Sequence, residues 1–318
     1  MSSYVVGVDL GGTKIYTALA TLDGKIRAEL KVPTLAREGY EVVLNRIAET
    51  VAEVQRLAGV SGGLLRVGVG APGPLDTETG IVYVAPNLGW RNAPLKASLE
   101  EIIGVPVFVD NDANLAAWGE FVYGAGRDVN DLVYLTVSTG IGGGLVLGGR
   151  LYRGAGCGAG EIGHITVLPD GPLCQCGNRG CLEALASGTA VAREAKSLIT
   201  QGKGRAILAA AGGVIETVTA ETVSQAAIRG DGEALGLFNA AARWLGIGVA
   251  GVINLLNPAI VVLGGGMMKS ASLFWGTFEE EAKRRAFSSA WEAAQVATAE
   301  LGGRAGVFGA VAYALKPG

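Results

Sequence analysis

The sequence predicts an α/β fold of two similar lobes around a central cleft, and three observations support this. Apolar, strand-like runs alternate with amphipathic helical segments along most of the chain. Residues 132–154 repeat the order of the N-terminal residues: an apolar strand, a glycine turn, a second apolar strand and a second turn. Finally, a chain of 318 residues is long for one hydrophobic core and comfortable for two.

The N-terminal part of the chain predicts strands first and mixed elements afterwards. The first thirty residues contain three apolar runs, YVVGVD, IYTALAT and IRAELKV, separated by tight turns. The elements expected next are a helix at 38–57, a strand at 66–70, a helix at 95–103, a strand at 105–110 and a helix from 111–114 to 123.

The second half of the chain is predicted to be mainly helical. After a cysteine-containing loop, helices continue to residue 256, a strand covers 259–263, and further helices cover 273–285 and 305–315. The stretch 244–266 is apolar enough to suggest a membrane span, but Asn254, Asn257 and Pro258 interrupt it. We therefore expect a buried helix that ends near Asn257, followed by a buried strand.

Composition and charge indicate where in the cell the protein is expected and which classes of partner are not expected. The formal net charge is −3 and no run of Lys or Arg occurs, so neither nucleic acid nor an anionic membrane is an expected partner. The N-terminus lacks the features of a signal peptide. With only four cysteines, the protein is expected in the cytoplasm.

Glycine-rich turns are candidate phosphate sites. Glycine tolerates positive φ and has no Cβ, so a turn tip can direct several backbone N–H groups at one anion. Either turn alone could be an ordinary hairpin, and neither fits a Walker or a dinucleotide motif. As a related pair, they are expected to hold nucleotide phosphates from both sides of the cleft. The candidates are Gly11, Gly12, Thr13, Lys14, Thr139 and Gly140.

A third glycine cluster comprises Gly264, Gly265 and Gly266, after the predicted strand at 259–263. It is either a platform for the nucleoside or a simple strand-to-helix turn. At the end of another predicted strand stand Asp110, Asn111 and Asp112. They suit a catalytic base, because the carboxyl ends of strands face the crevice in α/β sheets, but equally a helix N-cap. The local pattern does not decide between these two roles.

The segment 157–181 contains all four cysteines and the only histidine, His164, with Cys157 before the histidine and the other three cysteines after it. A disulfide is disfavoured in the cytoplasm, and a catalytic thiol would have only His164 as its base. Structural zinc fits better, since it takes four nitrogen or sulfur ligands. Cys174, Cys176 and Cys181 would supply three of them, and spacing alone leaves Cys157 and His164 as alternatives for the fourth.

Several motifs, taken in order, resemble the ROK family of repressors, open reading frames and sugar kinases. They are DLGGTK, GAPGP, NLGW, DNDANLAAWGE, STGIGGG, GEIGH and CQCGNRGCLEALASGTA. The resemblance covers nearly the whole chain and is greatest to the bacterial ATP-dependent glucokinases of this family. It implies the actin-like, ribonuclease H-like sugar kinase fold, and a homodimer or homotetramer. The expected lobes are 1–113 with 304–318, and 114–303, which contains a zinc loop at 157–183.

The resemblance also implies an activity, namely transfer of phosphate from ATP to the 6-hydroxyl of glucose, with Mg²⁺ and a structural Zn²⁺. It assigns Asp112 as the base and Asp9 to the magnesium and terminal phosphates through water. The sugar contacts it implies are Asn87, Asn111, Asp112, Glu161, His164 and Glu183. It selects His164 as the fourth zinc ligand, beside Cys174, Cys176 and Cys181, and leaves Cys157 as a buried free thiol.

Other functions remain open at this stage. The sugar could instead be N-acetylmannosamine, N-acetylglucosamine, mannose or fructose, and polyphosphate could replace ATP as the donor. A sugar-responsive repressor would carry a DNA-binding segment ahead of the sugar-binding fold, whereas the first glycine turn begins here at residue 9. We therefore expect a kinase.

Overall fold

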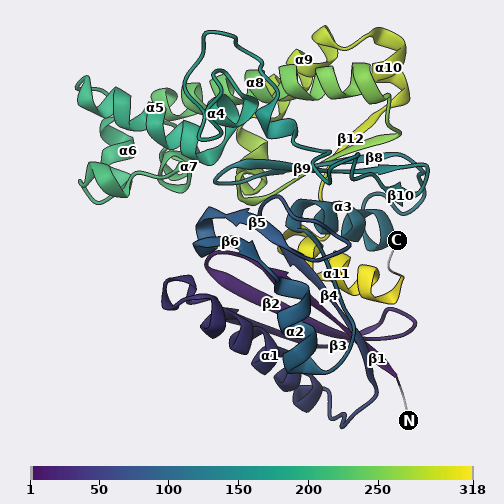
Figure 1. The fold of residues 1–318 in the computed structure, drawn as a ribbon. Coiled ribbons are helices and arrows are strands. Elements are labelled where there is room, and N and C mark those ends of the chain that lie inside the picture. The colour runs from purple at the N-terminus through teal and green to yellow at the C-terminus, as the bar shows by residue number, and fades with distance from the viewer. Residues whose placement is uncertain (1–2, 317–318) are drawn as a thin grey trace. The chain divides into compact units, whose positions relative to one another are not determined.

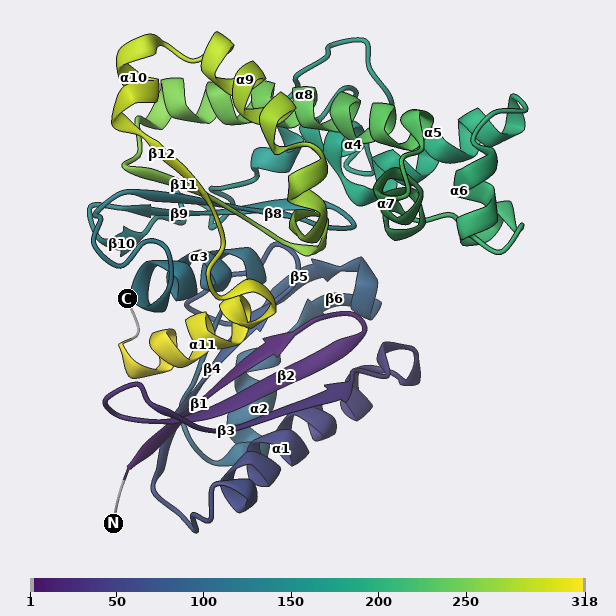
Figure 2. The same cartoon turned by 180° about the vertical axis from the view of Figure 1, so that it is seen from behind.

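The computed structural model describes residues 3–316, which form two five-stranded sheets, a two-stranded sheet and the helices that pack on them (Figures 1 and 2). The chain divides into two compact units, one of residues 1–134, 144–160 and 299–318, the other of residues 135–143 and 161–298. These units differ from the expected lobes because residues 114–134, 144–160 and 299–303, which had been expected in the second lobe, fall in the first unit. Residues 1–2 and 317–318 of the expected small lobe lie outside the described residues.

The first unit contains a five-stranded sheet with the order β3-β2-β1-β4-β7. The strands are β1 (Tyr4–Leu10), β2 (Lys14–Thr21), β3 (Ile26–Pro33), β4 (Leu64–Ala71) and β7 (Val107–Asn111). Strands β1, β2 and β3 pair antiparallel, whereas β4 pairs in parallel with both β1 and β7. The ends of β1 and β7, which carry the predicted site residues, are therefore carboxyl ends on the same edge.

Helices cover both faces of this sheet (Figure 2). Helices α1 (Tyr40–Leu57) and α2 (Leu95–Ile103) pack on one face, and α3 (Asp112–Tyr123) and α11 (Ala305–Leu315) pack on the other. Side chains alternate accordingly along β1: Val6 packs in a core with Ile47 of α1, while Val5 packs with Val311 of α11. Burial on both faces explains why β1 is apolar along its length rather than alternating with polar residues.

Backbone contact between α3 and α11 depends on glycine. A Cβ atom at Gly309 would lie 1.6 Å from the carbonyl oxygen of Leu115, and one at Gly119 would lie 2.3 Å from that of Ala305. A side chain of any size at either position would force the two helices apart. Because α3 begins with Asp112, this packing also fixes the helix that carries the predicted base.

Gly309→Ala is accordingly expected to lower the free energy of unfolding by about 3 kcal/mol, as severe overpacking does. Urea denaturation of the variant and of the parent protein measures the difference. Gly303→Ala is the matched control, because a Cβ at Gly303 would meet no atom within 4 Å. Equal stability of the two variants would show that α3 and α11 can separate at little cost.

The second five-stranded sheet has the order β10-β9-β8-β11-β12. Its strands are β8 (Leu132–Val137), β9 (Ile141–Leu147), β10 (Arg150–Leu151), β11 (Ile260–Gly264) and β12 (Gln295–Thr298). Ranked by position in the chain, both sheets have the order 3-2-1-4-5. The internal repeat expected from the two hairpins is thus confirmed at the level of whole sheets.

Helices make up most of the second unit. They are α4 (Leu182–Ala186), α5 (Gly188–Thr200), α6 (Arg205–Ala210), α7 (Ala220–Ile228), α8 (Gly232–Leu256), α9 (Trp275–Arg285) and α10 (Ser288–Ala293). By length and composition alone α8 could cross a bilayer, but 56% of its most apolar window is buried inside the structure and it packs against α9. It ends as expected, with Asn257 in the left-handed conformation at its C-cap and Pro258 beyond.

Candidate active site and metal centre

The first glycine turn joins β1 to β2 and is hydrogen-bonded to Thr34, the residue directly after β3. The Gly11 N–H donates to the Lys14 carbonyl at 2.9 Å. Thr34 is fully buried, its hydroxyl donates to the Gly11 carbonyl at 2.6 Å, and its N–H donates to the Thr13 carbonyl at 3.0 Å. Two carbonyls of the turn are therefore bound on the Thr34 side. No sequence motif singles out Thr34, which lies twenty residues beyond Lys14.

Asp9 is a half-buried carboxylate near the end of β1, just before this turn. Burial raises the pKa of Asp9, and the positive charges of Lys14 and Lys31 partly oppose that rise. The carboxylate lies against the first turn of α11, where a Cβ at Gly306 would be 2.8 Å from Asp9 Cγ. Mg²⁺ prefers oxygen ligands such as carboxylates. Gly306 on α11 leaves space for the Asp9 carboxylate, because a side chain at that position would collide with it.

Asn87 lies beside the same turn. It belongs to a short 3-10 segment (Pro86–Leu88) between β5 (Val82–Ala85) and β6 (Trp90–Ala93). A Cβ at Gly12 would be 2.9 Å from the Asn87 Cβ, so only glycine permits this approach. The first unit thus brings one predicted sugar contact next to a predicted nucleotide contact.

Asn111 and Asp112 occupy the junction between β7 and α3. Asn111 is the N-cap of α3, where its Oδ1 accepts from the N–H groups of Ala113 at 2.9 Å and Asn114 at 3.3 Å. Its Nδ2 donates to the Gly73 carbonyl at 3.3 Å. Asp112 is the first residue of the helix and accepts from Ala113 N–H at 2.8 Å. Capping, the simpler of the two roles considered for this motif, is therefore what Asn111 does in the structure.

The second glycine turn, between β8 and β9, lies against the third glycine cluster in the second unit. Ser138 N–H donates to the Gly140 carbonyl at 2.8 Å, closing the turn. A Cβ at Gly265, whose φ is +92°, would lie 2.4 Å from the Val137 carbonyl oxygen. The N–H groups that begin α5 also bind this turn, Gly188 to Ser138 at 2.7 Å and Thr189 to Thr139 at 3.2 Å.

Glu183 connects the second turn to the cysteine loop. Its Oε2 accepts a hydrogen bond from the Ile141 N–H at 2.8 Å. A Cβ atom at Gly140 would lie only 2.4 Å from this oxygen, so the contact requires glycine there. Its Oε1 is 3.8 Å from the Cys174 sulfur. Glu183 had been expected only as a sugar contact. The structure adds a bond to the turn that is predicted to bind phosphate.

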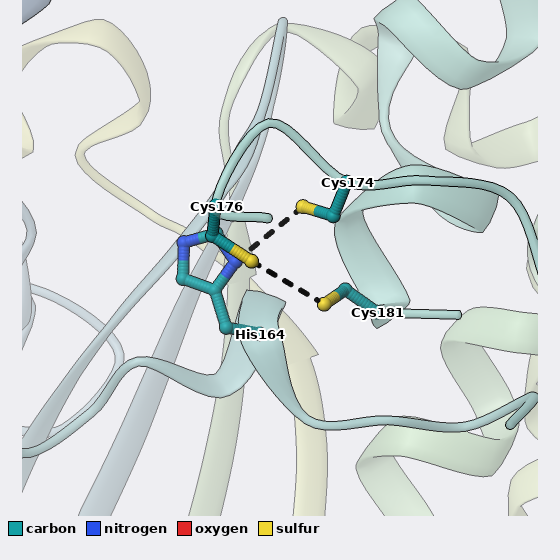
Figure 3. Close-up of side chains that lie close together, drawn as sticks. All are labelled: His164, Cys174, Cys176 and Cys181. Atoms are coloured by element: carbon teal, nitrogen blue, oxygen red, sulfur yellow. Dashed lines mark hydrogen bonds between the residues drawn. The ribbon is translucent and has the colours of Figure 1, made fainter. Parts of the chain in front are cut away.

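His164, Cys174, Cys176 and Cys181 form one cluster (Figure 3). Their potential ligand atoms all lie within 4.8 Å of one another, with His164 Nδ1 3.7 Å from Cys174 Sγ and Cys176 Sγ 3.7 Å from Cys181 Sγ. Ligand atoms around a tetrahedral zinc with bonds of about 2.0–2.3 Å are roughly 3.5–3.8 Å apart. The two pairs at 3.7 Å already have this spacing, and the widest separation, up to 4.8 Å, would have to shorten by about 1 Å for one tetrahedral ion to bind all four side chains.

Short backbone contacts shape this loop. Cys174 N–H donates to the Asn178 carbonyl at 2.7 Å, and Gly177 N–H donates to the Cys174 carbonyl at 3.0 Å. Gly180, with φ +68°, packs so closely on Leu168 that a Cβ there would lie 1.5 Å from the Leu168 carbonyl oxygen. Burial raises the pKa of the Cys174 thiol, whereas the Asn178 N–H lowers the pKa of the exposed Cys176 thiol.

The two ring nitrogens of His164 have different surroundings. Nδ1 faces the cysteines (Figure 3). Nε2 lies 3.9 Å from Glu161 Oε2. A metal on Nδ1 would leave Nε2 as the N–H nitrogen, beside another predicted sugar contact. Cys157 is not among the four; it is half-buried, has a φ of +57°, and its sulfur is 3.7 Å from Thr77 Oγ1.

The predicted site residues divide between the two units. Asp9, Gly11, Gly12, Thr13, Lys14, Asn87, Asn111 and Asp112 belong to the first. Thr139, Gly140, Glu161, His164, Cys174, Cys176, Cys181, Glu183, Gly264, Gly265 and Gly266 belong to the second. Within each unit the structure brings a predicted sugar contact beside a glycine turn, as Asn87 and Glu183 show.

Comparison with known proteins identifies the family of this chain. The profile of the ROK family matches residues 5–316. Glucokinase from Streptomyces coelicolor is 38% identical over 315 residues, which cover 98% of this chain and 98% of that protein. The crystal structure of a ROK hexokinase from Thermus thermophilus, 40% identical, superposes with a TM-score of 0.84 over 99% of this chain and all of the other.

A second solved structure is a ROK family glucokinase from Streptomyces griseus in complex with glucose and AMPPNP. It is 38% identical, with a TM-score of 0.84 over 98% of this chain and 99% of that one. These likenesses confirm the expected actin-like sugar kinase fold. With a family match and relatives that both span nearly its whole length, the chain belongs to the ROK family.

Proposed function

We propose that this protein is an ATP-dependent glucokinase, which transfers the terminal phosphoryl group of ATP to the 6-hydroxyl of glucose. The observation that carries the proposal is its near full-length similarity to glucokinases, one of them solved with glucose and AMPPNP. The proposal is also supported by a carboxylate at a strand end and by two glycine turns, which are the kinds of group that the reaction uses.

Asp112 is the proposed general base. It accepts the proton of the 6-hydroxyl while that oxygen forms its bond to the terminal phosphorus and the bond from phosphorus to ADP breaks. Its place at the first residue of α3, beyond the carboxyl end of β7, supports the assignment. Asn111 would orient the sugar through Nδ2, whose present bond to the Gly73 carbonyl is long enough, at 3.3 Å, to be exchanged.

The phosphates are proposed to bind the two glycine turns, with Gly11, Gly12, Thr13, Lys14, Thr139 and Gly140 as donors, and the nucleoside to bind at Gly264, Gly265 and Gly266. When bound, Mg²⁺ neutralises charge on the phosphates, and Asp9 would hold it through water. Glu161, His164, Glu183 and Asn87 are the proposed hydroxyl contacts. Each carboxylate can accept two hydroxyl hydrogens, which fixes the orientation of the ring.

We also propose that His164, Cys174, Cys176 and Cys181 hold a structural zinc ion. The support is the tight grouping of their ligand atoms, within 4.8 Å of one another. Four protein ligands leave no open position for a reacting water, so the ion would supply stability and orientation. It would fix the tautomer of His164 and hold the loop that leads to Glu183.

We propose a cytoplasmic location for the protein. All four cysteines are free of disulfides, as expected of an enzyme in the reducing cytoplasm. A homodimer or homotetramer is proposed from the family alone. Neither nucleic acid nor a membrane is a proposed partner, because the sequence contains no run of Lys or Arg that could bind phosphate groups.

The deciding experiment measures ADP release with ATP and a panel of glucose, mannose, fructose, N-acetylglucosamine and N-acetylmannosamine. We expect the highest kcat/KM with glucose, and a much lower rate when polyphosphate replaces ATP. Reactions without sugar control for background ATP hydrolysis. A higher kcat/KM for another sugar would assign the protein to that sugar, and sugar binding without turnover of any would indicate a regulator.

A further inference from the structure

Asp110, the residue before Asn111, is a fully buried carboxylate in which both oxygens are hydrogen-bonded. Its Oδ1 accepts from the Asn111 N–H at 2.7 Å and from Asn114 Nδ2 at 3.0 Å. Its Oδ2 accepts from Arg153 Nε at 2.7 Å. Asp110 itself faces away from solvent, so it is not positioned to touch a substrate.

The bonds of Asp110 enclose the proposed base on both sides. Asn111 precedes Asp112 directly, and Asn114 lies in the first turn of α3 behind it. One carboxylate therefore fixes the backbone before Asp112 and a side chain after it, which defines where α3 starts. A displacement of this carboxylate would shift the Asp112 side chain, because helix and strand meet at these four residues.

Arg153, from a distant part of the sequence, holds the Asp110 carboxylate in place. It follows β10 by two residues, its side chain is only 17% exposed, and its guanidinium also lies 5.5 Å from the centre of the Tyr313 ring on α11. A buried carboxylate is stable as an anion only when it is paired and hydrogen-bonded. Arg153 supplies that positive charge, in a fixed orientation that Tyr313 helps to maintain.

We propose that Asp110 and Arg153 form a positioning pair that holds the β7–α3 junction, and thereby Asn111 and Asp112, in the arrangement needed for phosphoryl transfer. This inference rests on the proposed role of Asp112. The pair acts through its neighbours, so its loss affects the chemical step more than nucleotide binding, which is assigned to other segments. A misplacement of about 1 Å at a reacting group can cost about 100-fold in rate.

The test compares Arg153→Met, Arg153→Lys and Asp110→Asn by steady-state kinetics and thermal unfolding. For Arg153→Met and Asp110→Asn we expect kcat to fall by about 10- to 100-fold, with the KM for ATP within about twofold of the parent value. Arg153→Lys keeps the charge without the planar guanidinium, so a smaller fall in kcat is expected. It also provides the test if Arg153→Met is not recovered folded.

A double variant separates pairing from independent effects. In Asp110→Asn with Arg153→Met both charges are absent, so neither is left buried alone. We expect its kcat to be no lower than that of the worse single variant, which is the non-additivity of two groups that act as one. Multiplied losses would show that the two residues act separately, and would overturn the pair.

Glu120→Gln is the matched control for stability. Glu120 is a second fully buried carboxylate on α3, and it accepts from the backbone N–H groups of Ala125, Glu300 and Leu301. Its loss should lower the unfolding temperature while kcat is kept. The same pattern in Arg153→Met, lower stability with full kcat, would overturn the proposal. If Asp112→Asn abolishes turnover in that case, the base assignment stands and only the pair fails.

Discussion

Asp112→Asn is expected to lower kcat for glucose phosphorylation by about 100- to 10,000-fold, the usual contribution of a general base. The amide keeps the shape of the side chain, and its oxygen can still accept the hydrogen bond that Asp112 takes from Ala113 N–H at 2.8 Å. It has no basic oxygen to take the proton of the 6-hydroxyl. Turnover should therefore collapse while the start of α3 and the binding of glucose, measured by calorimetry, are retained.

The chain offers a control with the same chemical change. Asp231 caps α8, where its carboxylate accepts from the Ala234 N–H at 2.8 Å, and no site residue was predicted there. Asp231→Asn should keep kcat within about twofold, since an asparagine caps a helix as well as an aspartate does. Substantial turnover by Asp112→Asn, with glucose still bound, would remove Asp112 from the role of base.

Replacing Cys181 by serine is expected to release the metal and to lower the free energy of unfolding by about 4 kcal/mol or more, because loss of a metal site is among the largest single-residue effects. The buried Cys181 sulfur lies 3.7 Å from the Cys176 sulfur, so its loss opens the tetrahedral set. The KM for glucose should rise as well, since His164 and Glu183 are attached to this loop. Elemental analysis should find about one zinc per parent chain and none in the variant.

Cys157→Ser is the matched control for Cys181→Ser. Cys157 contacts Thr77 and stands outside the cluster of four, so its replacement should keep the zinc, the stability and the KM for glucose. Loss of zinc from Cys157→Ser would instead support a site of four cysteines without His164. A parent protein with four reactive thiols and no bound metal would contradict the zinc site altogether.

Much of the fold could be predicted from local pattern. The helix expected at 95–103 is α2 with the same bounds, and the helix expected at 305–315 is α11, because amphipathic or fully apolar stretches between glycine and proline signals are distinctive. The strand β12 was missed. Its sequence, QVAT, is short and only half-buried, and it becomes a strand by pairing with β11, which no local signal reveals.

The candidate site shows the same division between local and distant information. Motifs identified residues whose neighbours along the chain define their role, such as the three cysteines. They could not identify Thr34, Gly306 or Arg153, because each acts through a partner that is distant in sequence. Arg153 and Asp110, for example, are 43 positions apart. They also could not reveal that Glu183 binds the Ile141 N–H, since that bond depends on how α4 is placed.

The covering of the first sheet by α11 has a consequence for how the protein is made. A growing chain emerges from the ribosome N-terminus first, and Val5 and Ala18, which pack on Val307 and Val311, emerge long before their partners. The stretch 161–298 of the second unit, which contains His164 and the three clustered cysteines, is synthesised without interruption in the meantime. A nascent chain would therefore hold an uncovered valine and alanine surface until its last helix appears, and chains stalled before α11 should depend on chaperones.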